Sequence, residues 1–388
     1  MRRHALIVAL VVGTALIAAL VAPSRAKPQQ HAKQSRALLV GIFDEQSTLG
    51  SPDWAFPQYK TLGVEALRVN LYWGGPSGVA HKKRPANARN PADPAYDWTI
   101  YDAFVKRAAE NHIKPVFSIL WTPNWAGSAK NRSPRRTIDL RNFAFAAAKR
   151  YSGSFHPDPN SPDTLPAVRY WLAWNEPNNP VFLQPQFQKI GPRKYALASP
   201  RIYAGICNAV MSGVHLTGLP GEKVACGVTA PRGNNTGTQP RPSVSPLIFL
   251  RGLKRAHARF DVYAHHPYYQ HPNESPSKPP PGPRAVTLGN INELLAELKR
   301  LYGNKHLWIT EYGYQTNPPD RSFGVSWIRQ ARYVSQAYGI ARRNPRIDMM
   351  IWFLVKDEAR IGNGWQSGFY TASGRRKPSY QAFRRMPK

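Results

Sequence analysis

Residues 171–178 read WLAWNEPN. Apolar side chains lead up to Asn175 and Glu176, and Pro177 ends the run because proline has no backbone N–H to donate. This pattern predicts a buried strand whose end delivers a carboxylate to the rim of a sheet. The rest of the chain can be understood around this stretch.

A second stretch of the same design lies at residues 306–313, which read HLWITEYG and carry Glu311. Hydrolysis of a glycosidic bond with retention needs two carboxyl groups about 5–5.5 Å apart. One protonates the leaving oxygen and later activates water, while the other attacks the anomeric carbon. We therefore hypothesise that Glu176 and Glu311 form such a pair, since both close a predicted strand.

The remaining sequence alternates short apolar runs with longer amphipathic ones. Nearly continuous apolar runs are typical of parallel strands covered on both faces, and helical patterns such as 97–112 and 288–301 lie between them. Eight strands alternating with helices predict an α/β fold, a closed (β/α)8 TIM barrel. A doubly wound sheet is the alternative, but no Gly-rich phosphate turn follows the first strand. The predicted strands are 37–43, 65–71, 114–120, 168–174, 223–229, 260–265, 306–311 and 347–353.

The 388 residues could form more than one domain, but a single barrel with insertions accounts for them. We expect residues 36–388 to be one catalytic domain. Its strand-to-helix loops are long, and in a barrel these loops lie at the C-terminal face, where active sites occur. The long loops are 72–96, 121–136, 177–200, 230–246, 266–286 and 354–377.

The first 26 residues resemble an export signal. Arg2 and Arg3 form a positive start, residues 5–22 are uncharged and apolar, and small residues precede position 27. The apolar run is also just long enough to span a bilayer, so a retained membrane anchor is the alternative. Residues 27–35 form a polar tether. In both cases we expect the barrel to lie outside the cytoplasm.

The formal net charge is +31, and a chain beginning at residue 27 would carry +28, because the first 26 residues hold three Arg and no acid. Such a charge favours anionic partners. The basic residues are scattered and no nucleic-acid motif accompanies them, so we expect no nucleic-acid partner. A diffuse basic surface and a selected acidic or cell-envelope glycan both remain open. The oligomeric state is not encoded in any visible pattern, and a monomer is the simplest expectation.

Cys207 and Cys226 are the two cysteines, too few for a metal site. They form either one disulfide or two buried thiols. His265 and His266 are poor metal ligands together, because adjacent strand residues point apart. We therefore expect no metal and no cofactor.

Arg68 is a cation within an apolar run, and a buried arginine is rare unless it is paired. Its partner could be the ionised nucleophile Glu311, or a structural acid such as Glu65 or Asp44. The acid of the pair needs a raised pKa and hence an apolar setting, which the tryptophans before Glu176 would supply.

These motifs resemble the clan A retaining glycoside hydrolases, a group that includes families 5 and 39. The resemblance covers roughly residues 37–385 and rests on Asn-Glu-Pro after the fourth strand and Thr-Glu-Tyr-Gly after the seventh. It implies that Glu176 is the acid/base, that Asn175 binds the sugar 2-hydroxyl and that Glu311 is the nucleophile supported by Arg68.

Further matches are the sequence AHHPY at 264–268 and Trp352 in the eighth strand. In the clan a sixth-strand His or Tyr bonds the nucleophile, which leaves His265, His266 and Tyr268 as candidates; we favour His266, with Tyr268 second. It also implies that Trp352 forms the floor of the sugar subsite.

Three tryptophans in the predicted loops, Trp73, Trp121 and Trp125, are candidates to stack on sugar rings. Strict strand alternation would place Asn175 and Glu176 on opposite faces, so both reach a sugar only if the strand bulges or ends there. A transglycosylase using the same site and a non-catalytic polysaccharide-binding protein are the rival functions. The sugar and its linkage depend on how the long loops pack.

Overall fold

The computed structural model describes residues 38–362 and 364–388. Within them, eight parallel strands close into a barrel in the order β1-β10-β9-β8-β7-β4-β3-β2. The predicted TIM barrel is confirmed, and each predicted strand differs from its observed counterpart by no more than two residues at either end. The barrel strands are β1 (Leu39–Phe43), β2 (Ala66–Tyr72), β3 (Lys114–Leu120), β4 (Tyr170–Ala173), β7 (Lys223–Thr229), β8 (Val262–His265), β9 (Leu307–Tyr312) and β10 (Ile347–Trp352).

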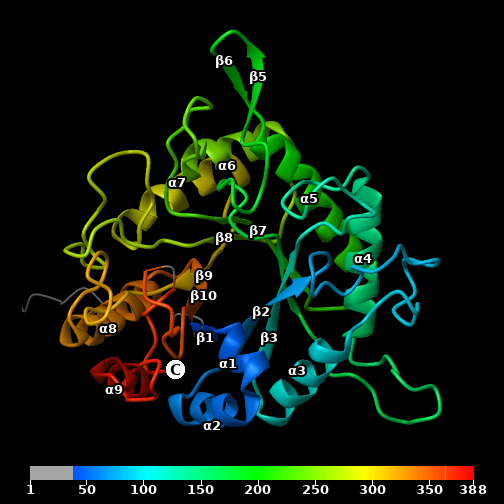
Figure 1. The fold of residues 1–388 in the computed structure, drawn as a ribbon, viewed down its shortest axis with the longest axis horizontal. Helices are drawn as coiled ribbons and strands as arrows, with labels where there is room; N and C mark the ends of the chain where they lie inside the picture. Colours follow the sequence, from blue (N-terminus) through cyan, green and yellow to red (C-terminus); the bar gives the residue numbers. More distant parts are fainter. Residues whose placement is uncertain (1–37, 363) are drawn as a thin grey trace, which may run out of the picture. The chain divides into compact units, whose positions relative to one another are not determined.

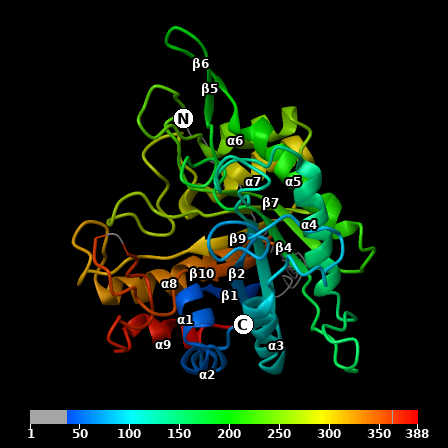
Figure 2. The same cartoon turned by 45° about the vertical axis from the view of Figure 1, so that its right-hand side comes forward.

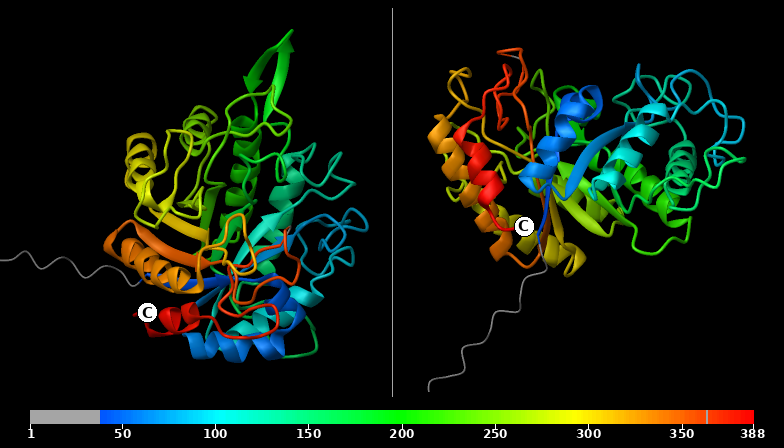
Figure 3. Two further views of the ribbon diagram at one scale, coloured as in Figure 1. Left: turned by 60° about the vertical axis from the view of Figure 1, so that its left-hand side comes forward. Right: turned by 90° about the horizontal axis from the view of Figure 1, so that it is seen from below.

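Helices surround the barrel (Figure 1). The last helix, α9, packs beside α8 and α2, so the C-terminal part of the chain contacts an early helix of the same barrel (Figure 3). No helix in the described part of the chain is long and apolar enough to span a membrane. The export signal expected at 1–26 and the tether expected at 27–35 lie outside the described residues. The helices are α1 (Glu45–Gly50), α2 (Pro52–Leu62), α3 (Thr99–Glu110), α4 (Thr137–Arg150), α5 (Ser199–His215), α6 (Pro246–Arg255), α7 (Ile291–Tyr302), α8 (Trp327–Arg343) and α9 (Pro378–Arg385).

The helix expected over 288–301 is present, and residues at its two ends determine where it begins and ends. A short 3-10 turn at Leu288–Asn290 leads into α7, whose leucines bury one apolar stripe. Gly303 follows with φ +75°, a backbone conformation that glycine adopts without steric cost, and the helix ends there.

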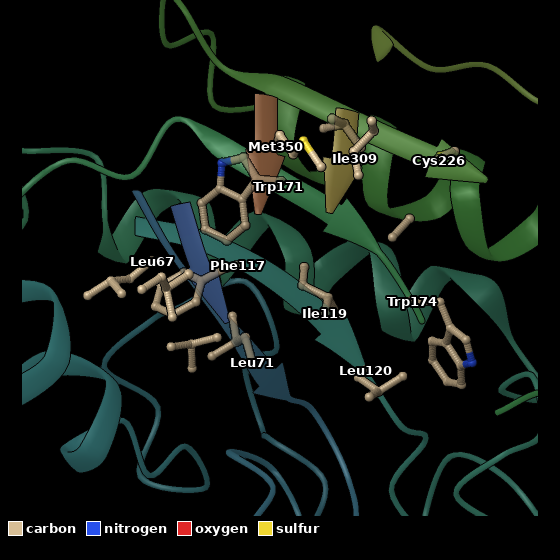
Figure 4. Packing of buried hydrophobic residues seen from close by; sticks show 14 of the residues in the cluster. Leu67, Leu71, Phe117, Ile119, Leu120, Trp171, Trp174, Cys226, Ile309 and Met350 are labelled. Atoms are coloured by element: carbon tan, nitrogen blue, oxygen red, sulfur yellow. The ribbon is translucent and has the colours of Figure 1, made fainter. Parts of the chain in front are cut away.

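The core has two layers because strand residues alternate in direction. In β4, Trp171 packs between barrel and helices with Phe117, whereas Leu172 points into the barrel interior with Val116. Figure 4 shows the outer layer, where Trp171 and Phe117 pack against each other. This alternation decides which residues at the strand ends reach the mouth of the barrel.

One element was not predicted. Residues 177–200, expected to be a loop, contain an antiparallel hairpin made of β5 (Phe187–Gly191) and β6 (Lys194–Leu197). The hairpin projects away from the barrel in both Figure 1 and Figure 2. Most of its residues are at least partly exposed, so it lacks the apolar alternation by which a half-buried strand is recognised in a sequence.

Cys207 and Cys226 form a disulfide, so the alternative of two free thiols is wrong. The bond joins the middle of α5 to β7, with the two Cα atoms 5.9 Å apart. A disulfide is consistent with a location outside the reducing cytoplasm. It also restricts the unfolded chain, because it closes a loop of 19 residues.

We predict that the double variant Cys207→Ala/Cys226→Ala loses about 3 kcal/mol of unfolding free energy, the entropic effect expected for a loop of this size. Denaturant titration of the parent with and without dithiothreitol provides the control. Reduction should lower the stability of the parent by a similar amount and leave the variant unchanged. Equal stability of oxidised and reduced parent would contradict the prediction.

Candidate active site

The end of β4 presents two neighbouring polar residues to the same cleft. The strand ends at Ala173, and the backbone is left-handed at Trp174 (φ +71°) and Glu176 (φ +37°). These turns interrupt the strand alternation, so Asn175 and Glu176 both line the cleft at the mouth of the barrel. The Glu176 N–H donates to the Val228 carbonyl at 2.8 Å, which holds the turn against β7.

Arg68 is the central cation of the site. Its side chain is fully buried, and Nη1 donates to Glu311 Oε1 at 2.8 Å and to the Thr310 carbonyl at 3.0 Å. Nη2 donates to Asn175 Oδ1 at 2.6 Å. The carboxylate partner expected for this buried arginine is therefore Glu311. The alternative partners are occupied elsewhere, since Glu65 accepts from the Val40 N–H and Asp44 accepts from Ser47.

Glu176 lies in a different environment from Glu311. Burial raises the pKa of Glu176 to about 7, although the Asn179 amide donates to its Oε2 at 3.1 Å and partly opposes the rise. It forms no ion pair with an arginine or lysine of the described residues. At neutral pH this carboxyl group therefore holds a proton for part of the time, as a general acid requires.

The two carboxyl groups are close together. One oxygen of Glu176, one oxygen of Glu311 and a ring nitrogen of His266 all lie within 4.8 Å of one another. Retaining glycosidases hold their carboxyl groups about 5–5.5 Å apart, whereas inverting enzymes need about 6.5–9.5 Å to admit a water molecule. The spacing is closer to the retaining range than to the inverting one, so it fits direct attack by one carboxylate.

His266 links the pair. Its Nδ1 lies 3.1 Å from Glu176 Oε1 and its Nε2 lies 3.2 Å from Arg68 Nη1, which is always a donor. Burial lowers the pKa of His266 to about 3, so the ring is neutral. We infer from this network that Nε2 carries no proton and that Nδ1–H donates to Glu176.

We expected His266 to bond Glu311, with Tyr268 as the alternative. The hydroxyl of Tyr268 donates to Glu311 Oε2 at 3.3 Å, whereas His266 Nδ1 is 3.6 Å from that oxygen, which is long for a hydrogen bond. In the structure it is therefore Tyr268, the second choice, that hydrogen-bonds Glu311. His265 points elsewhere, toward Thr229 Oγ1 and the Val286 carbonyl.

Two predicted sugar-stacking tryptophans are core residues. Trp73 is fully buried and stacks on Phe143, and Trp352 is fully buried with its indole N–H donating to the Ser367 carbonyl at 2.9 Å. Trp352 points toward the helices, because Ile351 before it belongs to the barrel interior. Because successive strand side chains point to opposite faces, Phe353 and not Trp352 lines the cleft.

Trp121 and Trp125 are half-buried beside the site and do not line the cleft. Trp121 stacks on Phe182, with ring centroids 5.7 Å apart, and Phe182 is the ring that reaches the cleft. The Trp125 indole donates to the Ala80 carbonyl at 2.7 Å. Trp121 therefore does not face the cleft itself but packs behind Phe182, which does.

The cleft itself has a volume of about 950 Å³, near the upper end of the range of about 300–1,000 Å³ for small-molecule sites. It contains both glutamates. Several of its other lining residues were not predicted, and most of them come from loops whose packing leaves no periodic signal. These are Glu45, Asn70, Asn179, Phe182, Arg232, Arg241, Ser243, Tyr269, Gln315, Phe323 and Phe353.

Glu176, His266 and Glu311 also have the spacing of a potential metal site. Their surroundings fit a metal poorly. The Arg68 guanidinium already occupies the anionic side of the cluster, donating to Glu311 and lying 3.2 Å from His266 Nε2. The raised pKa of Glu176 further reduces the negative charge available to a divalent ion.

No family model matches the chain, and no curated protein matches it at a significant level. Solved structures do. A family 39 glycoside hydrolase from Bacteroides cellulosilyticus WH2 aligns with a TM-score of 0.59 and 19% identity, covering 90% of this chain and 63% of that one. A glucosidase from Croceicoccus marinus aligns with a TM-score of 0.63 and 14% identity, covering 90% and 65% respectively.

The chain thus spans less than two thirds of these two proteins. It spans the whole of a fungal β-1,4-galactanase, which aligns over 90% of this chain with a TM-score of 0.54 and 15% identity. Identities this low establish a common fold alone. The described chain therefore has an eight-stranded barrel fold similar to that of these glycoside hydrolases.

The raised pKa of Glu176 generates a stability prediction. Folding favours its protonated form, so the stabilisation is complete below pH 4.5, the ordinary pKa, and is lost as the pH rises through about 7. Glu176→Gln stays neutral. It should gain stability relative to the parent between about pH 4.5 and pH 8, by up to about 3 kcal/mol.

Denaturant titrations of both proteins across this pH range measure the effect. Glu110→Gln on the exposed side of α3 is the control for loss of one carboxylate. A stability difference between Glu176→Gln and the parent that does not change with pH would show that Glu176 titrates normally.

Proposed function

We propose that the chain is a retaining glycoside hydrolase, with Glu176 as the acid/base and Glu311 as the nucleophile. The observation that carries this proposal is the pair of carboxyl oxygens within 4.8 Å, one bonded to a buried guanidinium and the other buried without an arginine or lysine ion pair in the described residues. The barrel fold shared with glycoside hydrolases supports a carbohydrate substrate.

In the first step Glu311 attacks the anomeric carbon while Glu176 gives its proton to the leaving oxygen. The C–O bond to the leaving group breaks as the ester bond to Glu311 forms. In the second step Glu176, now ionised, removes a proton from water, whose oxygen displaces Glu311 from the same carbon. The configuration is retained because it inverts twice.

The neighbouring residues then have defined tasks. Arg68 and Tyr268 donate to the two oxygens of Glu311 and so fix the orientation of its carboxylate. Asn175, held by Arg68, can present its amide N–H group to a sugar hydroxyl. His266 fixes the Glu176 carboxyl group through Nδ1. Together these contacts preorganise both carboxyl groups before substrate binds.

We further propose that the enzyme acts outside the cytoplasm, as a barrel domain of residues 36–388 behind an N-terminal export or anchor segment. The disulfide between Cys207 and Cys226 supports this location. The apolar run at residues 5–22 supports the targeting segment.

The nucleophile is tested by Glu311→Ala. Removal of an attacking carboxylate should lower kcat on an activated aryl glycoside by at least about 1,000-fold. Added azide can occupy the vacated space and should restore turnover, giving a glycosyl azide of inverted configuration. Glu110→Ala should behave as the parent. The readouts are phenol release and the configuration of the product.

A panel of aryl glycosides and polysaccharides supplies the substrates. Polymers that are bound but never cleaved by the parent would replace the hydrolase proposal with polysaccharide binding. An azide product of inverted configuration from Glu176→Ala, with none from Glu311→Ala, would exchange the two roles.

The roles also predict a pH profile. The rate kcat/KM of the parent should fall above about pH 7, because Glu176 then loses the proton that the leaving group needs. Glu176→Gln should be much slower on glycosides with poor leaving groups and should lack this alkaline limb on activated ones. An unchanged alkaline limb in Glu176→Gln would assign the titration to another group.

A further inference from the structure

One wall of the cleft is basic. Arg232 and Arg241 lie on the long loop between β7 and α6, and both line the cleft together with Ser243 and Asn179. Arg232 is close enough to Glu176 for its charge to act on that carboxyl group, lowering its pKa against the larger effect of burial. We call Arg232 and Arg241 the arginine wall.

The guanidinium groups of the arginine wall are available to a ligand. Across residues 38–362 and 364–388, no side chain or backbone group forms a hydrogen bond or ion pair with either one. Both residues are exposed. By contrast, both terminal nitrogens of the buried Arg68 donate hydrogen bonds, to Glu311, Asn175 and the Thr310 carbonyl.

Among the described residues, neither Asp44, Glu45 nor Glu358, the acidic lining residues besides the catalytic pair, forms an ion pair with this wall. Glu45 accepts from the backbone and side-chain amides of Asn70 and from the Tyr72 hydroxyl. Glu358 lies on the loop after β10 and accepts from the Trp365 N–H. The positive charge is thus concentrated on the side of the cleft built after β4 and β7.

The arginine wall also continues beyond the cleft. A neighbouring hollow of about 530 Å³ shares Arg232 and Ser243 with it and extends to Arg284, an exposed residue before α7. Two connected depressions with arginines along them suit a chain of several sugars better than a single ring. Arginine binds carboxylate, sulfate and phosphate groups through paired N–H donors.

Resting on the proposed function, we propose that the substrate is an acidic polysaccharide whose anionic groups bind the arginine wall on the leaving-group side of the scissile bond. Glu176 protonates the leaving oxygen, so the sugars that depart extend along the wall next to it. The opposite side, with Phe353 and Trp365, then holds the sugar that becomes attached to Glu311.

Binding is measured separately from cleavage. The protein carrying Glu311→Gln is titrated with polygalacturonate, alginate and hyaluronan, and with the carboxyl-reduced form of each. Dextran sulfate against dextran tests sulfate as the anionic group. The double change Arg232→Gln/Arg241→Gln is then added. Arg384→Gln/Arg385→Gln, on the exposed side of α9 and outside the cleft, removes the same charge as a matched control.

We expect at least one acidic polymer to bind about tenfold or more tightly than its neutral counterpart, which is the effect of one charge-assisted hydrogen bond. The arginine-wall variant should lose this preference and the control should keep it. No preference for acid across the panel, or a preference that survives in the arginine-wall variant, overturns the inference. Charge-selective binding by a parent that cleaves none of the bound polymers would leave the inference standing and remove the hydrolase proposal instead.

Discussion

The active-site arrangement depends on one buried cation. Arg68 stands on β2, yet it reaches Glu311 at the end of β9 and Asn175 beyond the end of β4. Removing a guanidinium from water costs several kcal/mol unless its donors are satisfied. The fold meets this cost by directing three separate strand ends toward the same group. The positions of the two carboxyl groups follow from that requirement, because Asn175 is bonded to Glu176 by the peptide chain.

The same cation contacts only one of the two glutamates. Glu311 is in direct contact with Arg68, whereas Glu176 has a neutral histidine and an amide as its nearest polar partners. Two acids of one residue type thus have different charged and polar neighbours through position alone. His266 maintains this difference, because its pKa of about 3 prevents it from becoming a second cation beside Glu176. A charged imidazole there would favour ionised Glu176 and remove the proton that the first step uses.

The barrel and its two carboxylates could be predicted from the sequence because both depend on the spacing of apolar residues and on the order of the strands along the chain. Continuous apolar runs marked the strands, and equivalent positions at parallel strand ends lie on one face. The aromatic contacts could not be predicted in the same way. Trp352 and Phe353 are adjacent, and only the register of β10 shows that the tryptophan faces the helices. Trp73 packs with Phe143 of α4, a contact between segments distant in sequence. Arg232 and Arg241 carried no signal beyond a general excess of basic residues.

At the end of β4, the regular alternation of a strand conflicts with the need to place two neighbouring side chains in one cleft. A regular strand would turn Asn175 and Glu176 to opposite faces, and the left-handed residues Trp174 and Glu176 avoid this at a cost of about 1–2 kcal/mol each. The surroundings offset that cost with ordinary contacts. The Trp174 N–H donates to Ile119 on β3 at 2.9 Å, its indole donates to the Phe182 carbonyl at 2.7 Å, and Glu176 bonds the backbone of β7. The strained turn is therefore held from both neighbouring strands and from its own loop. A barrel provides this support because every strand end has a partner on each side, so an irregular backbone can be kept at one position without opening the sheet.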